Sequence, residues 1–95
     1  MFGEIPDCMF LDVPVRLSDS GHAHITRESF NPMTLCDMII NNIPCPKKNS
    51  KRRFRQTSVE LCATRKGKIY RIILDKEYTR CIDSFAYVVN HVEPI

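Results

Sequence analysis

A run of nine residues in the middle of the chain, 47–55, restricts the possible folds more than any other feature. It contains six of the fourteen Lys and Arg residues of this 95-residue sequence and no acidic residue. Cations at this density cannot be buried without partners, and the run shows no hydrophobic periodicity. The sequence therefore predicts a flexible basic loop over residues 46–56, with an ordered part of the chain on each side.

The same run divides the charge of the chain. Residues 1–46 carry six acidic and two basic residues, a net charge of −4, whereas residues 47–95 carry five acidic and twelve basic residues, a net charge of +7. The overall charge of +3 hides this separation. We therefore expect the second half of the chain to contact a polyanion or an acidic partner.

Length and composition predict one domain over residues 1–95. A hydrophobic content of 43% is enough for a single core. No apolar run approaches the roughly 18–20 residues of a membrane span, and no basic region precedes an apolar one at the N-terminus, so neither a transmembrane segment nor a signal peptide is expected. The five cysteines are odd in number and widely spaced: Cys8, Cys36, Cys45, Cys62 and Cys81. We interpret them as reduced, mostly buried thiols of a protein of the cytoplasm or nucleus.

The first half of the chain predicts a hairpin followed by a helix. Apolar residues alternate with polar ones from Leu11 to Leu17, which predicts a half-buried strand over residues 9–17. A polar turn ending at Gly21 would lead into a return strand over residues 22–27. Asn31 and Pro32 are suited to the N-cap and first position of a helix, whose apolar stripe ends before residues 41–42.

The second half repeats this order. Apolar residues alternate over residues 57–64, and a turn at Gly67 would lead back along residues 69–74. Seven apolar positions between Tyr78 and Val92 follow helical spacing, which predicts a helix over 76–92 with Asp75 as its cap. The alternative is a strand over residues 85–89, favoured by aromatic and β-branched content. The predicted fold is α+β in the order ββαββα: one antiparallel sheet from two hairpins, with both helices on one face.

The basic loop is the leading candidate for a binding site. Lys and Arg side chains gain affinity for nucleic acid by releasing condensed counterions, and an aromatic ring among them can stack on an unpaired base. The predicted contact residues are Lys47, Lys48, Lys51, Arg52, Arg53, Phe54 and Arg55, extended from the neighbouring turn by Arg65, Lys66 and Lys68. Arg71 could extend the same surface. We therefore predict a protein that binds nucleic acid, RNA or single strands, without catalysis.

Other interpretations of the loop remain open. Its two basic clusters, 47–48 and 51–53, can act as a nuclear localisation signal, the same charge can bind anionic lipid, or the loop can be merely solvated. The main alternative function is a protein-interaction or assembly module, such as a small viral accessory or matrix-like protein, with the loop on an acidic partner. The apolar face of the helix expected over 76–92 could also support a homodimer.

Metal binding and catalysis find little support in the sequence. His22, His24, Cys36 and Cys45 are ligand types that suit zinc, but structural zinc sites usually have closer cysteine pairs. Cys36 also lies on the apolar stripe of the expected helix, where a buried thiol explains it. No nucleophile has an activating neighbour, and no Gly-rich phosphate loop occurs. We predict no cofactor, no metal and no enzymatic activity.

Overall fold

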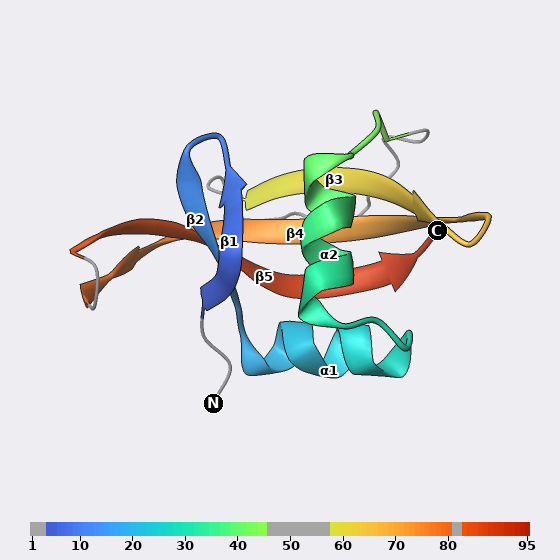
Figure 1. The fold of residues 1–95 in the computed structure, drawn as a ribbon, viewed down its shortest axis with the longest axis horizontal. Coiled ribbons are helices and arrows are strands. Elements are labelled where there is room, and N and C mark those ends of the chain that lie inside the picture. The colour runs from blue at the N-terminus through green and yellow to red at the C-terminus, as the bar shows by residue number, and fades with distance from the viewer. Residues whose placement is uncertain (1–3, 46–57, 81–82) are drawn as a thin grey trace.

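The structure is a computed structural model that describes residues 4–45, 58–80 and 83–95. The elements in this part of the chain are β1 (Glu4–Phe10), β2 (Val13–Leu17), α1 (Asp19–Arg27), α2 (Pro32–Ile40), β3 (Ser58–Arg65), β4 (Lys68–Thr79) and β5 (Ser84–Pro94). The strands form one sheet in the order β1-β2-β5-β4-β3, which curves like half of a barrel, with both helices on one side (Figure 1). The expected ββαββα order is therefore wrong. The described chain is mostly β, and its two helices follow one another.

The largest correction concerns the end of the chain, where the helix expected over 76–92 is a strand. β5 pairs antiparallel with β4 from residue 84 to residue 94. A bulge between Ile73 and Leu74 leaves one extra residue in β5, so that Val89 and Val92, three positions apart, are both buried in the core. This bulge imitates helical spacing in the sequence. The β-branched and aromatic content that favoured a strand was the better guide.

The expected return strand at residues 22–27 is also wrong, because this segment belongs to α1. The Ser18 side chain caps the helix by accepting a hydrogen bond from the Gly21 amide at 3.0 Å, and Asp19 lies in the first turn, where the helix dipole favours an acid. The Ser18 hydroxyl also donates to the Val89 carbonyl at 3.0 Å. The polar residues 18–21, which we interpreted as a turn, thus form the N-terminal end of α1, which packs against β5.

The strand expected over residues 9–17 is a hairpin. Leu11 and Asp12 both have positive φ, 52° and 62°, as a two-residue turn between β1 and β2 requires. Leu11, which continued the apolar alternation, is therefore exposed. β2 then pairs with β5 in parallel, from Val15↔Tyr87 to Leu17↔Val89, which makes the sheet mixed rather than antiparallel.

Two predictions are confirmed. α2 begins where expected, with the Asn31 side chain accepting from the Thr34 amide at 2.8 Å and Pro32 in the first turn. β3 and β4 form the expected hairpin, whose turn contains Lys66 and Gly67 at positive φ. Both elements have short-range signals that packing against the rest of the chain does not override.

The core lies between the curved sheet and the two helices. α1 packs on β5, and α2 packs on β1 and β3 (Figure 1). The largest fully buried side chains include Ile25, Leu35, Ile39, Ile72 and Leu74.

Four of the five cysteines form disulfides, contrary to the expected reduced thiols. Cys8 of β1 is bonded to Cys36 of α2, with 5.8 Å between the Cα atoms. Cys45 is bonded to Cys62 of β3, with 5.2 Å between the Cα atoms. The sequence separations of 28 and 17 residues gave no sign of this proximity, because the fold alone brings the partners together. Cys81 lies outside the described residues.

Removing either disulfide should destabilise the protein. We expect Cys8→Ala/Cys36→Ala and Cys45→Ala/Cys62→Ala each to lower the free energy of unfolding by about 2–4 kcal/mol, because an uncrosslinked unfolded chain has more conformational freedom. Urea unfolding measures the change, and Cys81→Ala, which leaves both disulfides intact, is the control. Denatured, non-reduced protein should show at most one titratable thiol; three or more would contradict the pairing.

Gly21 should not tolerate a side chain. A Cβ atom at this position of α1 would lie 2.1 Å from the carbonyl oxygen of Val89 in β5. Alanine favours helix by about 1 kcal/mol relative to glycine, but the forced separation of α1 from β5 should cost about 1–3 kcal/mol. We therefore expect Gly21→Ala to lower the urea midpoint. Ala23→Gly, at an exposed position of the same helix, should show only the propensity loss, and a stabilised Gly21→Ala protein would show that the helix does not pack this closely.

Candidate nucleic-acid interface

The polybasic segment predicted to bind nucleic acid, residues 47–55, lies outside the described residues, together with the rest of the loop expected over 46–56. Seven of the ten predicted contact residues therefore have no described position: Lys47, Lys48, Lys51, Arg52, Arg53, Phe54 and Arg55. The residues that flank the segment are described.

Both flanking positions are fixed to the same edge of the sheet. Cys45, before the segment, is bonded to Cys62 of β3, and the neighbouring Ile43 amide donates to the Cys62 carbonyl at 2.8 Å. Ser58, after the segment, begins β3 opposite Asp75 and donates its hydroxyl to the Asp75 carboxylate. The described chain thus stops and resumes at points four residues apart along β3.

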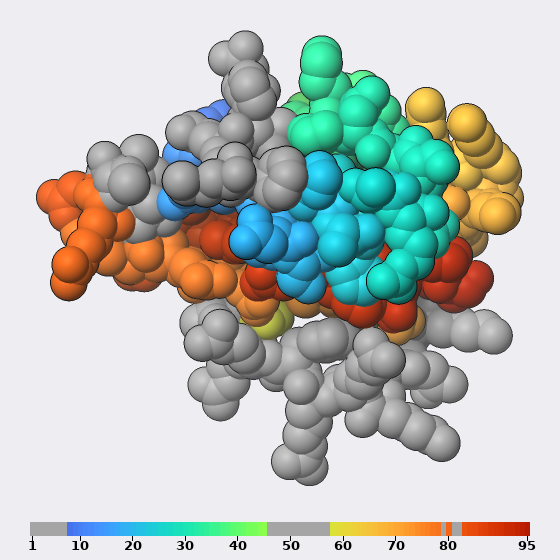
Figure 2. Space-filling view, turned by 90° about the horizontal axis from the view of Figure 1, so that it is seen from below, coloured from blue at the N-terminus to red at the C-terminus, as the bar shows by residue number. Residues whose placement is uncertain are grey.

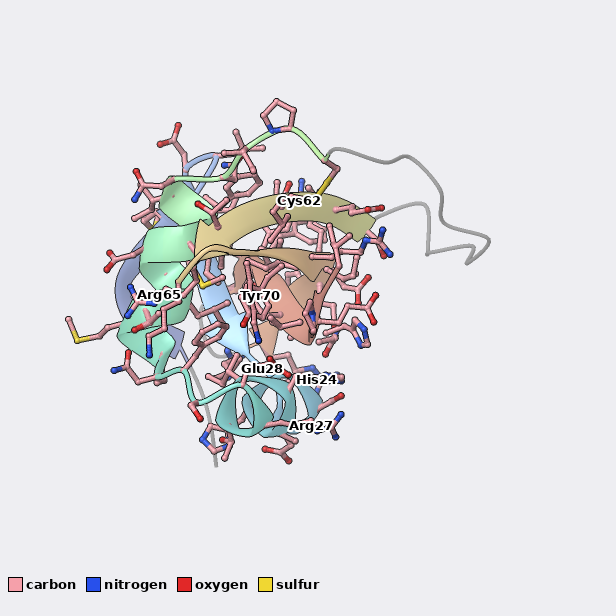
Figure 3. All side chains as sticks on the ribbon, turned by 90° about the vertical axis from the view of Figure 1, so that its right-hand side faces the viewer. His24, Arg27, Glu28, Cys62, Arg65 and Tyr70 are labelled. Carbon is pink, nitrogen blue, oxygen red and sulfur yellow. A yellow bond between two sulfur atoms is a disulfide. The ribbon has the colours of Figure 1, made fainter. Side chains whose placement is uncertain are left out.

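The remaining predicted contact residues form an exposed basic turn. Arg65, Lys66 and Lys68 lie at the junction of β3 and β4, and all three are exposed. Within the described part of the chain, none of these cations forms an ion pair. Arg65 lies beside α2, three residues along β3 from Cys62 (Figure 3). The turn therefore presents three exposed cations, one of which, Arg65, shares a hollow with Asp37 of α2, close along β3 to Cys62, where the chain before the polybasic segment is bonded.

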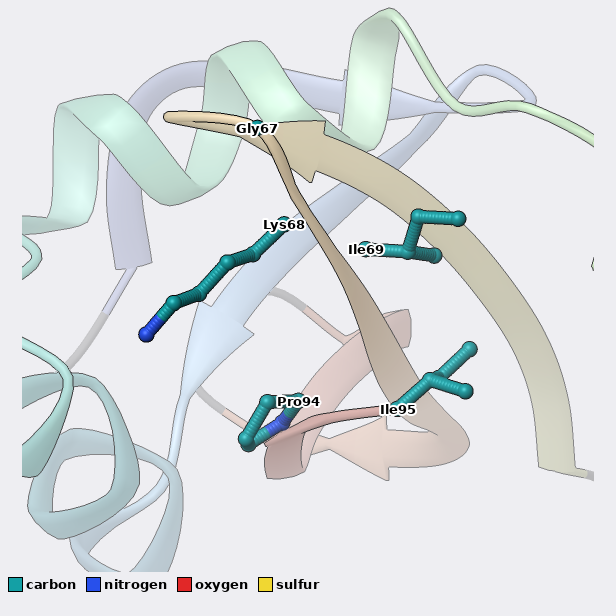
Figure 4. Close-up of a pocket in the computed structure, with 5 residues that line it drawn as sticks. All are labelled: Gly67, Lys68, Ile69, Pro94 and Ile95. Atoms are coloured by element: carbon teal, nitrogen blue, oxygen red, sulfur yellow. The ribbon is translucent and has the colours of Figure 1, made fainter.

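A shallow hollow lies beside this turn. Its lining comes from the start of β4 and the end of the described chain: Gly67, Lys68, Ile69, Pro94 and Ile95 (Figure 4). The Ile95 amide donates to the Ile69 carbonyl at 2.9 Å, which fixes the chain end against β4. Lys68 is the only ionisable side chain among these lining residues.

Arg71 does not extend the basic surface, contrary to expectation. Its guanidinium lies 2.9 Å from a Glu60 oxygen and 3.4 Å from a Glu93 oxygen, and its side chain is 14% exposed. The His91 ring also lies 3.0 Å from the Glu93 carboxylate. The charge of Arg71 is therefore neutralised by neighbouring strands.

The four residues considered for zinc do not form one site. Cys36 and Cys45 belong to different disulfides, which removes both as thiolate ligands while those bonds are intact. His24 packs against His91 instead, with 4.2 Å between ring centroids. Among the described residues, no group of three or more His, Cys, Asp or Glu side chains is arranged to hold a metal ion.

The contact between His24 and His91 disfavours a charged His24. Burial at the interface of α1 and β5, the nearby His91 and the Arg27 guanidinium together lower the pKa of His24 below its ordinary value of 6.5 (Figure 3). A backbone hydrogen bond at Val92 and the Glu93 carboxylate oppose this shift. Neutral His24 is thus the form that fits this packing.

This lowered pKa predicts that acid weakens the fold. In the unfolded chain His24 should take up a proton near pH 6.5, whereas the folded protein resists protonation, so the free energy of unfolding should fall as the pH drops below about 6.5. Urea unfolding between pH 7.5 and 5.5 measures this fall. His24→Gln should flatten the profile, whereas His22→Gln, on the same helix, should retain it. Identical profiles for wild type and His24→Gln would contradict the assignment.

One exposed pair of aromatic residues was not expected from the sequence. Tyr78 and Phe85 were placed on a buried helix face, but they lie opposite one another on β4 and β5 and are 54% and 50% exposed. Loss of the helix also removes the apolar face that suggested a homodimer. The aromatic and β-branched content of residues 85–89 was the one signal in the sequence that indicated a strand here, and therefore a pairing of these residues with β4.

No protein-family model matches the chain, and no curated protein or solved structure shows significant similarity to it. In the part of the chain that the structure describes, neither helix is long and apolar enough to cross a membrane.

Proposed function

We propose that this protein binds nucleic acid, RNA or single strands, through the polybasic segment 47–55 and the basic turn formed by Arg65, Lys66 and Lys68, without catalysis. The observation that carries the proposal is the turn itself, whose three cations are exposed and without ion pairs among the described residues. Phosphate groups of a nucleic acid would then form the ion pairs that these three cations do not form with the described acidic side chains.

Charge in this arrangement favours a polyanion. The segment contributes six cations and the turn three more, and each phosphate contact releases about one condensed counterion. Because phosphate contacts do not read bases, this surface gives affinity without sequence preference. Arg71 takes no part, since Glu60 and Glu93 neutralise it.

The two disulfides set a condition on where this binding takes place. Disulfides persist in oxidising compartments, whereas the cytoplasm and nucleus keep thiols reduced. Binding in the location expected from the sequence therefore requires that the reduced protein also folds. Binding measured with and without a dithiol reductant shows whether the reduced protein still binds or whether binding requires the disulfides.

Salt dependence provides the test of this function. Fluorescence anisotropy with labelled single- and double-stranded RNA and DNA should show binding that weakens steeply with salt. We expect Lys51→Ala/Arg52→Ala/Arg53→Ala to reduce the log–log salt slope by roughly two to three, and Lys66→Ala/Lys68→Ala by roughly one to two. Arg16→Ala/Arg27→Ala, which removes two cations elsewhere, is the matched control.

Absence of binding at about 100 mM salt, or equal losses in the control variant, would contradict the proposal. The alternative, a protein-interaction module, would then be the better description. Association with a protein partner that persists when the segment is neutralised would support that alternative.

A further inference from the structure

β4 and β5 form a two-stranded ribbon whose far end projects beyond the other described strands of the sheet. In the described residues, β3 accompanies β4 only as far as Ser58↔Asp75, and β2 accompanies β5 only from Val15↔Tyr87. β4 and β5 continue to pair with each other as far as Thr79↔Ser84. Figure 1 shows this ribbon end at the left of the sheet, and Figure 2 shows it standing clear of both helices.

Two aromatic rings occupy one face of this projection. Tyr78 and Phe85 are cross-strand partners whose ring centroids lie 5.8 Å apart with an interplanar angle of 79°. About half of each side chain is exposed. The two rings meet edge to face, and both keep aromatic surface open to solvent.

Charged side chains of both signs lie near the rings. Side chains alternate along a strand, so Lys76 lies on the same face as Tyr78, whereas Glu77 lies on the opposite one. The Lys76 ammonium is 5.3 Å from the centroid of the Phe85 ring. Asp83 accepts a hydrogen bond from the Tyr78 hydroxyl, which also raises the pKa of Tyr78 above its ordinary value. The exposed aromatic surface thus lies beside one exposed cation, Lys76 at Phe85, and beside one carboxylate, Asp83, which is already engaged by the Tyr78 hydroxyl.

Packing among the residues that the structure describes does not account for these rings. The core ends at Tyr87, which is buried and packs edge to face against Phe10 with 5.4 Å between ring centroids. Tyr78 and Phe85 lie beyond that point and do not belong to the core cluster. A cross-strand pair stabilises a ribbon by only about 0.2–1 kcal/mol, and an isolated two-stranded ribbon is marginal in water.

We propose that Tyr78 and Phe85 form a stacking site for unpaired bases of single-stranded nucleic acid, with Lys76 contacting an adjacent phosphate. Single-strand-binding proteins combine these same elements, aromatic rings for the bases and cations for the backbone. The proposal rests on the proposed function and deepens it, because paired bases inside a duplex cannot reach the rings. Ser58, the first described residue after the polybasic segment, lies opposite Asp75, three residues from Tyr78 along β4, or about 10 Å.

The chain contains an internal probe for this contact. It has three tyrosines and no tryptophan, and Tyr70 and Tyr87 are only 5% and 8% exposed. Tyr78 is therefore the one tyrosine with a largely exposed side chain. A base that stacks on Tyr78 should quench the fluorescence of this residue. We expect single-stranded oligonucleotides to quench it and a duplex of the same sequence, at equal occupancy, to leave it unchanged.

The decisive variant is Tyr78→Ile/Phe85→Ile, which removes the rings but keeps residues that favour strands. In anisotropy titrations its affinity for a single strand should fall about tenfold or more, with duplex affinity unchanged. Met33→Ala/Ile40→Ala, which removes exposed apolar side chains of α2, is the control and should bind as wild type. Tyr78→Phe, which keeps both rings, should also retain affinity, and circular dichroism checks that each variant is folded.

The two proposals fail in distinguishable ways. If wild type binds no nucleic acid at about 100 mM salt, the proposed function itself is wrong, and this site falls with it. If wild type binds in a salt-dependent manner but loss of the rings leaves affinity unchanged, or lowers single-strand and duplex affinity equally, the stacking site is wrong and the proposed function stands. Quenching by duplex equal to that by single strand would also overturn the stacking site.

Discussion

Most of the described structure depends on the backbone of β5. This strand pairs with β4 on one side and with β2 on the other, and it also receives α1. The Val89 carbonyl accepts from both the amide and the hydroxyl of Ser18, at 3.2 and 3.0 Å. Gly21 permits this approach, because any side chain there would collide with the same carbonyl. One residue of β5 thus fixes the start of α1 as well as the parallel pairing of β2.

This dependence explains which elements could be predicted from the sequence. α2 carries its own start signals in Asn31 and Pro32, and the β3–β4 turn carries Gly67, so both follow from local preferences. Residues 84–94, by contrast, form a strand because they pair with β4 and with β2, which lies far away in the chain. The bulge at Ile73 spaces the buried valines of β5 as in a helix, and no short-range signal reveals it.

The residues of the candidate site also fall into those that the sequence could locate and those that depend on distant partners. Composition alone located the polybasic segment and the basic turn, because dense charge must be solvated or bound wherever it lies. Composition could not show that Arg71 faces Glu60 and Glu93, since those partners come from neighbouring strands. It also could not show that Cys45 is bonded to Cys62. Strand register, as well as sequence, therefore determines which cations remain unpaired and available for binding.

Register also divides the cations of β4 and its turns into two groups. Arg65, Lys66 and Lys68 lie at one end of β4, and Lys76 lies toward the other end, beside the exposed rings, with the neutralised Arg71 between them. Figure 2 shows the β3–β4 turn and the ribbon end on opposite sides of the molecule. The twelve residues of β4 extend over roughly 36 Å, so neither group alone could hold a bound strand along this length. The two anchors of the polybasic segment, at positions 62 and 58 of β3, lie between the groups, opposite Arg71 and Asp75. Between the two groups, the only cation of β4 is Arg71, and its charge is already taken up by Glu60 and Glu93.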